Sequence, residues 1–427
     1  MTNTDQYKQA TLNLWKFTTS KFISAIGSSV YTFGIGLYVL MLTGSATGFA
    51  ITLVCGSVPR ILFAPIAGHL ADKFPRKLIV VTAQLSATLI MSTVLITTIM
   101  YELYLPLIYV TAALLAICST FSNIGLTSSI PNIIDSTRIQ KIIAFNQSAT
   151  SSASILGPVL GGLMFGVLSI EIFLLIYVIS YAITTTLEMR INFNLYMNDE
   201  EENETKKSKD ATLWISIKEG YKYVYQTRLL FVVVTTAFWV NFFAASLFIG
   251  LPFIVVQELE VSVQQFGLIE GALAVGMLVM SILLSVRKEF QNPINTMRNG
   301  LLLLSAFIAS IAIPLLISFE GLGLLFYYMG VALLIGSTLV FINTPLMVSL
   351  QKNTPEKLRG RVFALIETIA SAIAPIGMIL YGFIFDLLPA EWVVFSSSLT
   401  LFCITLYGLR SSQFVNEQKE KKISAVN

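Results

Sequence analysis

Twelve long apolar runs dominate this sequence, and they determine its fold class before any motif is considered. Each run holds at least about 20 residues, enough for a helix to cross the hydrocarbon core of a bilayer. Lipid offers the backbone no hydrogen-bond partner, so runs of this length must be helical. Only 12% of the 427 residues are charged, against about 25% in soluble domains. The sequence therefore predicts an all-α polytopic membrane protein with transmembrane helices at residues 14–42, 46–68, 77–101, 104–130, 142–166, 168–189, 229–256, 262–286, 299–318, 321–350, 361–386 and 391–410.

Lysine and arginine are distributed unevenly between the two sides of these expected spans. With the N-terminus in the cytoplasm, 26 of the 27 basic residues fall on inward segments, and Arg60 lies inside the second span. The outward loops carry acids as their only charged residues. Because loops rich in Lys and Arg stay on the cytoplasmic side, we expect both termini in the cytoplasm and an even number of spans. We expect the chain to be a multi-pass protein of a bacterial cytoplasmic membrane.

A hydrophilic segment separates the first six spans from the last six. Its first part, residues 199–207, is a charged linker with nothing to bury. Between Trp214 and Tyr225, apolar residues recur at helical spacing. This pattern fits either an amphipathic helix on the membrane surface or a plain extension of span seven. The expected organisation is an N-terminal half at 1–190, a cytoplasmic linker at 191–228, a C-terminal half at 229–412 and a cytoplasmic tail at 413–427.

The connection between spans two and three carries a charged motif. It reads Gly68-His69-Leu70-Ala71-Asp72-Lys73-Phe74-Pro75-Arg76-Lys77. This stretch resembles the signature found at the same place in the major facilitator superfamily. The match covers Gly68, Asp72, Lys73, Arg76 and Lys77, with Pro75 where a second glycine is usual.

Span five carries a second motif, Gly157-Pro158-Val159-Leu160-Gly161-Gly162. It resembles the core of that family's antiporter motif, although two upstream glycines are here Ala144 and Ala153. Residues 354–363 and 219–223 are similar to the macrolide-efflux branch, also called drug:proton antiporter-3. The basic residue in span four of two other proton-coupled branches is missing, so their proton relay is not carried over. The resemblance implies the major facilitator fold, with twelve helices in two pseudo-symmetric six-helix halves, and export by proton antiport.

The resemblance also places the charged stretch near the start of span eleven in one conformation. There Asp72 would meet the positive end of a helix dipole, worth ~0.3–1 kcal/mol, and Arg76 would pair with a nearby acid. Contacts made in one state and broken in the other form a latch. Lys73 and Lys77 are better explained as topology anchors, which is also the alternative for Arg76.

In span five, Gly161 and Gly162 permit close backbone approach, and Pro158 permits a bend. A pivot that moves during function and ordinary packing of small residues both fit this pattern.

Arg60, Glu270 and Glu367 are the ionisable residues expected at membrane depth, where charges are costly and often functional. At ~1.5 Å per residue, Arg60 lies ~12 Å and Glu367 ~9 Å from the inner face. Because the family fold places spans two and eleven side by side, we predict an Arg60–Glu367 ion pair in a cytoplasmic gate. Glu270 has no cation near it in sequence. It either carries the coupling proton, with Glu367 as a second candidate, or faces a water-filled vestibule.

Span seven contains an aromatic group with one amide: Phe238, Trp239, Asn241, Phe242, Phe243 and Phe248. Aromatic walls with few polar anchors suit a bulky amphiphile better than a sugar. The resemblance implies a cavity lined by spans one, four, seven and ten, to which Asn343 in span ten would add a polar contact. Asn146 and Gln147 in span five are further polar candidates. Packing or contact with lipid is the alternative for any single Phe.

These features predict a secondary transporter that exports a bulky amphiphilic molecule, such as a macrolide-like drug, by proton antiport with alternating access. A dedicated exporter of a metabolite such as a siderophore, a lipid flippase and a membrane protein without transport activity are the alternatives. The sequence has no metal-ligand cluster, nucleophile–base pair or ATP-binding loop, so we expect no enzyme, cofactor or metal. The expected partners are the lipid bilayer, the substrate and protons, without nucleic acid, and the chain is expected to be a monomer.

Overall fold

The structure is a computed structural model of the chain, and two compact units organise it. It describes residues 3–101, 103–196, 225, 228–287, 290, 292–317, 319, 321–354 and 356–408. One unit comprises residues 1–205 with 260–271, and the other comprises residues 206–259 with 272–427. Within the described residues the chain is helical, with short connections and no strands.

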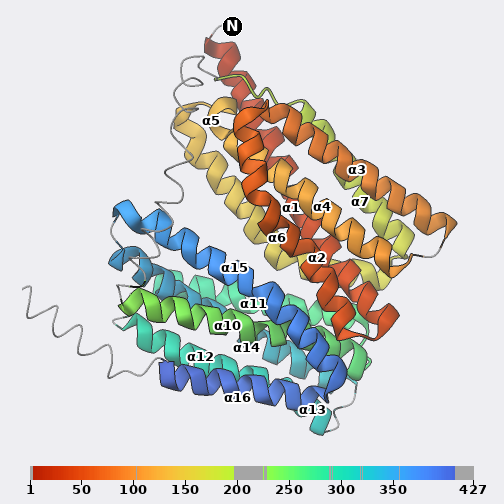
Figure 1. The fold of residues 1–427 in the computed structure, drawn as a ribbon, viewed down its shortest axis with the longest axis vertical. Helices are drawn as coiled ribbons and strands as arrows, with labels where there is room; N and C mark the ends of the chain where they lie inside the picture. The colour runs from red at the N-terminus through yellow and green to blue at the C-terminus, as the bar shows by residue number, and fades with distance from the viewer. Residues whose placement is uncertain are drawn as a thin grey trace, which may run out of the picture. The chain divides into compact units, whose positions relative to one another are not determined.

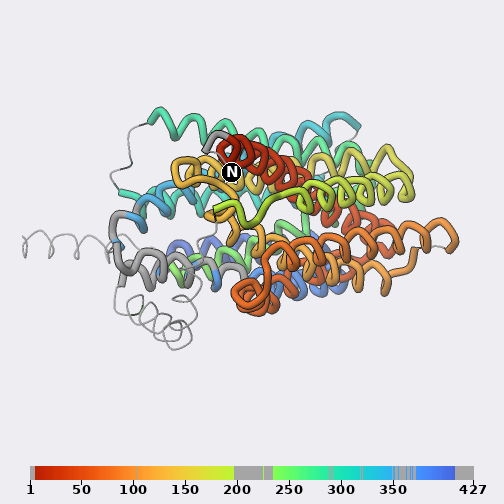
Figure 2. Tube along the Cα trace, turned by 90° about the horizontal axis from the view of Figure 1, so that it is seen from above, coloured from red at the N-terminus to blue at the C-terminus, as the bar shows by residue number. Residues whose placement is uncertain are grey.

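The first unit is a bundle of long helices with a short helical insert (Figure 1). Its helices are α1 (Asn3–Thr43), α2 (Ala46–Lys73), α3 (Arg76–Met100), α4 (Leu105–Ser128), α5 (Ile130–Ile133), the 3-10 turn η1 (Ser136–Arg138), α6 (Ile139–Val167) and α7 (Ile170–Met189). Helix α1 packs along α6, α2 along α4, and α3 along α4 and α7. Figure 2 shows the red α1 beside the yellow α6 from above. Helix α1 also contacts α2 and α7, so it is central to this unit.

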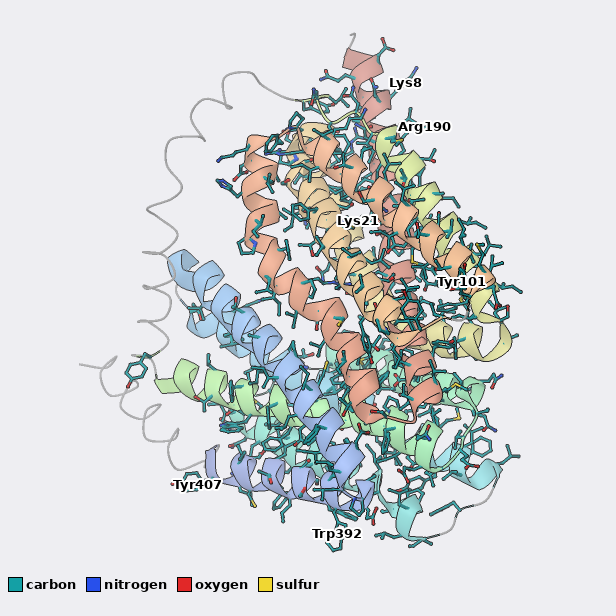
Figure 3. All side chains as sticks on the ribbon, turned by 45° about the vertical axis from the view of Figure 1, so that its right-hand side comes forward. Lys8, Lys21, Tyr101, Arg190, Trp392 and Tyr407 are labelled. Carbon is teal, nitrogen blue, oxygen red and sulfur yellow. The ribbon has the colours of Figure 1, made fainter. Side chains whose placement is uncertain are left out.

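Basic residues mark one end of the first unit, called the basic end below. Lys8 and Arg190 lie at this end, and Tyr101 lies at the opposite end (Figure 3). The Asn13 side chain donates to the carbonyl oxygens of Ile133 and Asn192, at 3.0 Å each. These bonds tie the start of α1 to α5 and to the segment after α7.

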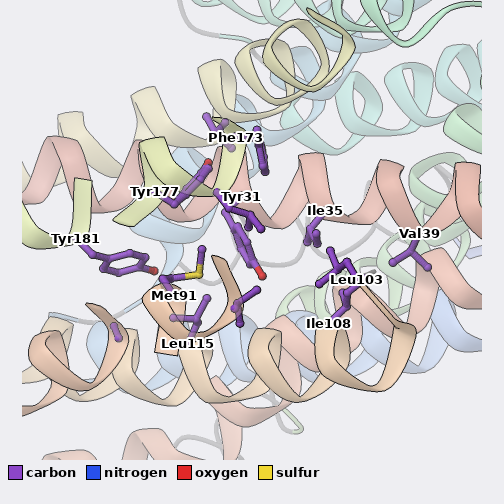
Figure 4. Close-up of a cluster of buried hydrophobic side chains, with 14 residues drawn as sticks. Tyr31, Ile35, Val39, Met91, Leu103, Ile108, Leu115, Phe173, Tyr177 and Tyr181 are labelled. Carbon is purple, nitrogen blue, oxygen red and sulfur yellow. The ribbon is translucent and has the colours of Figure 1, made fainter. Parts of the chain in front are cut away.

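Two clusters of buried apolar side chains fill the first unit. The central cluster, shown in Figure 4, includes Tyr31, Met91, Leu115, Phe173 and Tyr177. The Tyr31 and Tyr177 rings meet edge to face with centroids 5.2 Å apart. The second cluster lies around the basic end and includes Phe17, Leu126, Ile133 and Phe193. Two separate groups of apolar side chains therefore pack the first unit, one of them at its basic end.

The second unit is built in the same way. Its helices are α10 (Arg228–Pro252), the π-helical turn η2 (Phe253–Glu258), α11 (Val263–Val286, whose start belongs to the first unit), α12 (Pro293–Ser310), α13 (Ile313–Leu316), α14 (Leu322–Asn353), α15 (Glu356–Leu387) and α16 (Ala390–Gly408). Helix α10 packs on α15 and α16, and α12 packs on α14 and α16. The Tyr328 hydroxyl donates to the Ile311 carbonyl at 2.8 Å, and the Ser398 hydroxyl donates to the Ser305 carbonyl at 2.6 Å. Hydroxyl groups thus link neighbouring helices at positions where lipid offers no partner.

The predicted fold class is confirmed. Among the described residues, eleven helices are long and apolar enough to cross a membrane, and the shorter apolar segment Ala372–Leu387 lies within α15. Helices α1, α12 and α15 begin before the expected spans; α12 starts at Pro293 rather than 299 and α15 at Glu356 rather than 361, and the difference is largest for α1. Helix α1 begins at Asn3 rather than near residue 14, because Ala10 and Leu14 are buried in the cluster at the basic end. The amphipathic helix expected around Trp214 lies outside the described residues.

Candidate functional site

The charged stretch from Gly68 to Lys77 is mostly helical, which corrects the expected loop. Helix α2 continues to Lys73, α3 begins at Arg76, and only Phe74 and Pro75 connect them. The Phe74 amide still donates to the Leu70 carbonyl at 2.9 Å. Phe74 then adopts an extended conformation (φ −111°, ψ 157°), as expected for a residue before proline. The proline therefore ends α2 abruptly and allows a two-residue connection.

The charged side chains of this stretch have different surroundings. Asp72, Lys73 and Lys77 are exposed, whereas Arg76 is half-buried. The Arg76 guanidinium donates to the Ser128 carbonyl oxygen at 2.8 Å, and a cation is favourable at this C-terminal end of α4. Arg76 therefore joins α3 to α4. Its pairing with an acid and the Asp72 latch at span eleven stay predictions.

Arg60 lies beside a small cavity inside the first unit, formed by α1, α2, α4 and α7. The cavity has a volume of about 10 Å³, which is room for about one water. Its polar lining residues are Ser28, Tyr31, Thr32, Thr52, Arg60 and Tyr181. The Arg60 guanidinium donates to the Ser28 hydroxyl at 3.1 Å and remains exposed on its other side. The Glu367 side chain lies outside the described residues, so the Arg60–Glu367 pair stays a prediction.

Sequence reasoning missed two charged residues at membrane depth, Lys21 in α1 and Glu188 in α7. Only 7% of Lys21 and 1% of Glu188 is exposed. Both lie inside helices long and apolar enough to cross a membrane. Their positions within the expected spans 14–42 and 168–189 were a usable signal, but Lys21 was counted only as a marker of the inner side. Lys21 and Glu188 therefore join the three predicted residues as candidates for charges at membrane depth.

The glycines of the predicted antiporter motif lie on two faces of α6. A Cβ atom on Gly157 would lie 2.0 Å from the Ser29 hydroxyl oxygen, and one on Gly161 would lie 3.0 Å from the Val30 carbonyl oxygen. These two glycines therefore allow α1 to approach α6 closely. Helix α6 runs from Ile139 to Val167 with Pro158 inside it.

Gly162 faces the first turns of α11, which belong to the first unit. A Cβ atom on Gly162 would lie 2.8 Å from the Gly267 Cα atom. Near this contact, the Gln264 side chain donates to the Gly166 carbonyl. Glycine on both helices lets the backbones almost touch, as the sequence pattern predicts for close approach.

Glu270 lies one turn beyond this contact in α11 and is half-buried. A Cβ atom on the adjacent Gly271 would be 3.7 Å from a Val159 methyl group of α6, an ordinary contact. The Glu270 carboxylate has no hydrogen-bond or ion-pair partner among the described side chains. A carboxylate in this position is able to bind a proton without first breaking an ion pair.

Four of the predicted aromatic residues, Phe238, Trp239, Phe242 and Phe243, form one contact cluster on α10. The Trp239 ring lies 5.2 Å from Phe238, 6.2 Å from Phe242 and 6.0 Å from Phe243, measured between centroids. Trp239 keeps 38% of its surface exposed, and Phe248 is also exposed. The cluster therefore presents part of its aromatic surface outside the helix packing.

The amide side chains differ in their availability. The Asn241 amide donates to the Ala237 carbonyl of its own helix at 2.8 Å. Asn343 on α14 and Gln147 on α6 are exposed. The buried side-chain oxygen of Asn146 has no hydrogen-bond partner within the described part of the chain. His69 is exposed at the end of α2.

Asp135 and Arg138 form an ion pair at the basic end. Arg138 also contacts the first turns of α1. The Arg138 guanidinium donates to the Thr11 hydroxyl at 2.7 Å and lies 4.1 Å from the centre of the Tyr7 ring. Burial alone would raise the pKa of Asp135, but hydrogen bonds from Arg138 and Thr137 lower it below its usual value. A carboxyl group with a lowered pKa stabilises the fold above its unfolded pKa of about 3.9, and this contribution is lost as the pH falls further.

Asp135→Asn should therefore lower the melting temperature of the purified protein at neutral pH. The expected loss is about 0.2–1 kcal/mol, the range of ion pairs near the surface. The difference from wild type should shrink as the pH falls below about 4. Melting curves over this pH range test it, with Glu258→Gln, at an exposed acid, as the control. A difference that stays constant with pH would contradict the assignment.

Comparisons with known proteins extend these observations. The family model described as Major Facilitator Superfamily matches residues 17–378. Macrolide efflux protein A of Streptococcus pyogenes is 23% identical over 410 residues, which are 94% of this chain and 96% of that protein. The uncharacterized MFS-type transporter YfiS of Bacillus subtilis (strain 168) is 22% identical over 385 residues, 89% of this chain and 87% of that protein.

Solved structures give the same fold. The nucleoside transporter NupG has a TM-score of 0.64 and 11% identity, with 93% of this chain and 99% of that chain covered. A bacterial homologue of the iron transporter ferroportin, in an inward-facing state, has a TM-score of 0.63 and 13% identity, with 93% and 98% covered. At these identities the likeness concerns the fold alone.

Proposed function

Because this chain belongs to the Major Facilitator Superfamily, we propose that it is a secondary active transporter that exports a bulky amphiphilic small molecule by proton antiport. The molecule binds in a cavity that opens alternately to the two sides of a bacterial cytoplasmic membrane. Both chain termini lie in the cytoplasm, and the chain acts as a monomer.

The observation that carries this proposal is the similarity to Macrolide efflux protein A over nearly the whole of both chains. The aromatic cluster on α10 supports an amphiphilic substrate, because exposed Trp239 and its Phe neighbours offer apolar surface with few polar anchors. A macrolide combines a large apolar ring with a few polar groups and suits such a surface.

The first unit supports the mechanism. Proton antiport requires a group that changes its protonation during the cycle, and half-buried Glu270 beside the α6–α11 contact is our candidate, with Glu367 as a second. We assign Asp72 to a latch and Arg60 with Glu367 to a gate, both on the cytoplasmic side. Such contacts would form in one state and break in the other.

Transport in inverted membrane vesicles tests the proposal. An imposed gradient, acidic inside, should drive accumulation of the macrolide erythromycin, and a protonophore should abolish it. A tenfold proton gradient supplies at most about a tenfold accumulation for each proton exchanged. Vesicles without the protein are the control.

Other outcomes would contradict the proposal in distinct ways. Accumulation driven by a sodium gradient would exclude proton coupling. Accumulation of a siderophore, or movement of a labelled phospholipid between leaflets, with no response to any macrolide or amphiphilic dye, would replace the substrate class. If none of these compounds is moved, the assignment as an exporter is contradicted.

A further inference from the structure

The buried charges Lys21 and Glu188 lie in the first unit and are not among the groups assigned above. Lys21 is on α1, between the basic end and the end that carries Tyr101 (Figure 3). Glu188 is in the last turn of α7. Taking a charge from water into a low-dielectric interior costs several kcal/mol, so buried ions need partners.

Hydroxyl groups from two helices hold the Glu188 carboxylate. One oxygen accepts from the Ser20 hydroxyl of α1 at 2.5 Å, and the other accepts from the Ser122 hydroxyl of α4 at 3.4 Å. The shorter distance is typical of a hydroxyl donating to an ionised carboxylate. A carboxylate offers about four lone-pair sites, so these two bonds leave acceptor capacity for a proton.

Lys21 follows Ser20 on α1, and Asn123 follows Ser122 on α4, so Lys21 and Asn123 lie next to the two residues that hold Glu188. The Lys21 ammonium group donates to the side-chain oxygen of Asn123 on α4 and lies 5.9 Å from the centre of the Phe17 ring. Asn123 is exposed. The polar cluster therefore contains a buried carboxylate and a buried ammonium group, and it reaches the protein surface at the Asn123 amide.

Helix α3 adds an unusual neighbour. Helices α3 and α7 meet where the Thr88 and Thr185 hydroxyls are 3.1 Å apart. Successive spans alternate in direction, so α3, the third span, and α7, the sixth, are antiparallel. One turn towards the basic end, Gln84 on α3 is therefore at the level of Glu188 on α7. Gln84 is buried, and its amide nitrogen has no hydrogen-bond partner among the described residues.

The charged groups around Glu188 can be named helix by helix. Lys21 comes from α1. Helix α4 contributes Ser122 and Asn123, and α3 contributes Gln84, none of which titrates. Arg190 follows on the chain itself, and its carbonyl oxygen accepts from the exposed Lys16 ammonium group at 2.8 Å. Lys21 is thus the buried counter-charge among these groups.

We propose that Glu188 and Lys21 form a proton-binding site in the first unit, at which Glu188 takes up and releases a transported proton. This inference rests on the proposed proton antiport. When a proton binds, the carboxylate becomes a carboxylic acid, and the pair changes from neutral to singly positive. The new O–H group donates to the Ser122 hydroxyl, which serves equally as acceptor.

Protonation leaves Lys21 as a buried cation without a counter-charge. That state is costly, and moving the ammonium group outward to water, together with the exposed Asn123 side chain to which it already donates, relieves it. Proton binding thereby acts on α1 and α4, the two helices that carry these groups. A purely structural role explains the arrangement less well, since apolar side chains of similar size often stabilise a protein as much as a buried ion pair does.

Glu188→Gln tests the proposal in the purified full-length protein, because the amide keeps the shape of the side chain but cannot bind the proton. Infrared difference spectra between about pH 6 and about pH 8 should show a carboxylic acid band in wild type that is lost in Glu188→Gln. In proteoliposomes, the accumulation of erythromycin driven by one pH unit should fall about tenfold, the contribution of one proton. Exchange of labelled for unlabelled erythromycin should continue. Glu171→Gln, the same change in the first turn of the same helix, should alter neither result.

The double variant Lys21→Met/Glu188→Gln removes both buried charges and keeps the test available if the single variant does not fold. It should also lack the band and show the same tenfold lower accumulation per pH unit. If Glu188→Gln or the double variant keeps both the carboxylic acid band and the wild-type accumulation, Glu188 is not the proton site, while proton antiport stands. If the wild type shows no response to a pH gradient, the proposed function fails, and an absent Glu188 band then overturns the proton site as well.

Discussion

Gly276→Ala and Gly336→Ala should each lower the melting temperature of the purified protein, whereas Gly330→Ala should not. A Cβ atom on Gly276 in α11 would lie 2.0 Å from the Leu333 carbonyl oxygen of α14. A Cβ atom on Gly336 in α14 would lie 2.1 Å from the Leu273 carbonyl oxygen of α11. Both clashes involve backbone atoms, so no change of rotamer relieves them. A Cβ atom on Gly330, in the same helix as Gly336, meets nothing within 4 Å.

The size of the effect follows from how the two helices are held together. The Ser337 hydroxyl donates to the Gly276 carbonyl at 3.1 Å, so the crossing combines backbone packing with a hydrogen bond between helices. In lipid, such close packing is a main source of helix association. Overpacking costs about 1–3 kcal/mol, whereas alanine regains only about 0.5–1 kcal/mol over glycine within a helix. At Gly330 there is no clash, so only the higher helix propensity of alanine applies, and that variant should be as stable as wild type or slightly more stable.

Thermal unfolding in detergent, followed by the loss of monodisperse protein, measures all three variants together. The variant with both substitutions should lose less than the sum of the two single losses, because one displacement of the helices relieves both clashes. Equal melting temperatures for Gly276→Ala and Gly330→Ala would show that the crossing is looser than described.

The fold was predictable from sequence because a membrane restricts the choices. Long apolar runs must be helices, and the positions of Lys and Arg relate their ends to the two sides. The start of α1 was not predictable in this way. Residues before Leu14 are mixed in polarity, and they are helical because Ala10 and Asn13 contact α5 and the segment after α7.

Features of the candidate site were predictable when they depend on residues close together in the sequence, and not when they depend on contacts with other helices. Gly161 and Gly162 indicated close approach, but their partners Val30 and Gly267 are on other helices and only the fold identifies them. The position of Asn241 in a substrate cavity stays a prediction, and one of its two amide N–H groups donates to the Ala237 carbonyl of its own helix.

Charged residues near the ends of spans were the hardest to interpret. Lys21 fits the positive-inside pattern and Glu188 precedes Arg190, so both resembled residues at the membrane surface. Long side chains at such positions often extend to water. Only the packing of α1, α4 and α7 shows that these two do not.

Glu270→Gln should lower the substrate accumulation driven by a pH gradient while leaving substrate exchange intact. The carboxylate lies one turn from the Gly162–Gly267 contact, and it has no partner among the described side chains. An amide has nearly the same shape but cannot carry a proton. If one proton per cycle binds here, its loss lowers the accumulation ratio about tenfold for each pH unit imposed.

Accumulation and exchange of erythromycin, measured in the same proteoliposomes, separate coupling from binding. Glu258→Gln is the matched control, because it removes an exposed carboxylate outside α11. If proteoliposomes with Glu270→Gln accumulate as much erythromycin as those with Glu258→Gln at every pH gradient, Glu270 faces a water-filled vestibule and carries no coupled proton. If Glu270→Gln and Glu188→Gln each lose about one factor of ten per pH unit, the protein exchanges two protons per cycle. The accumulation ratio of the wild type must then rise about a hundredfold per pH unit, which the same vesicles measure independently of either variant.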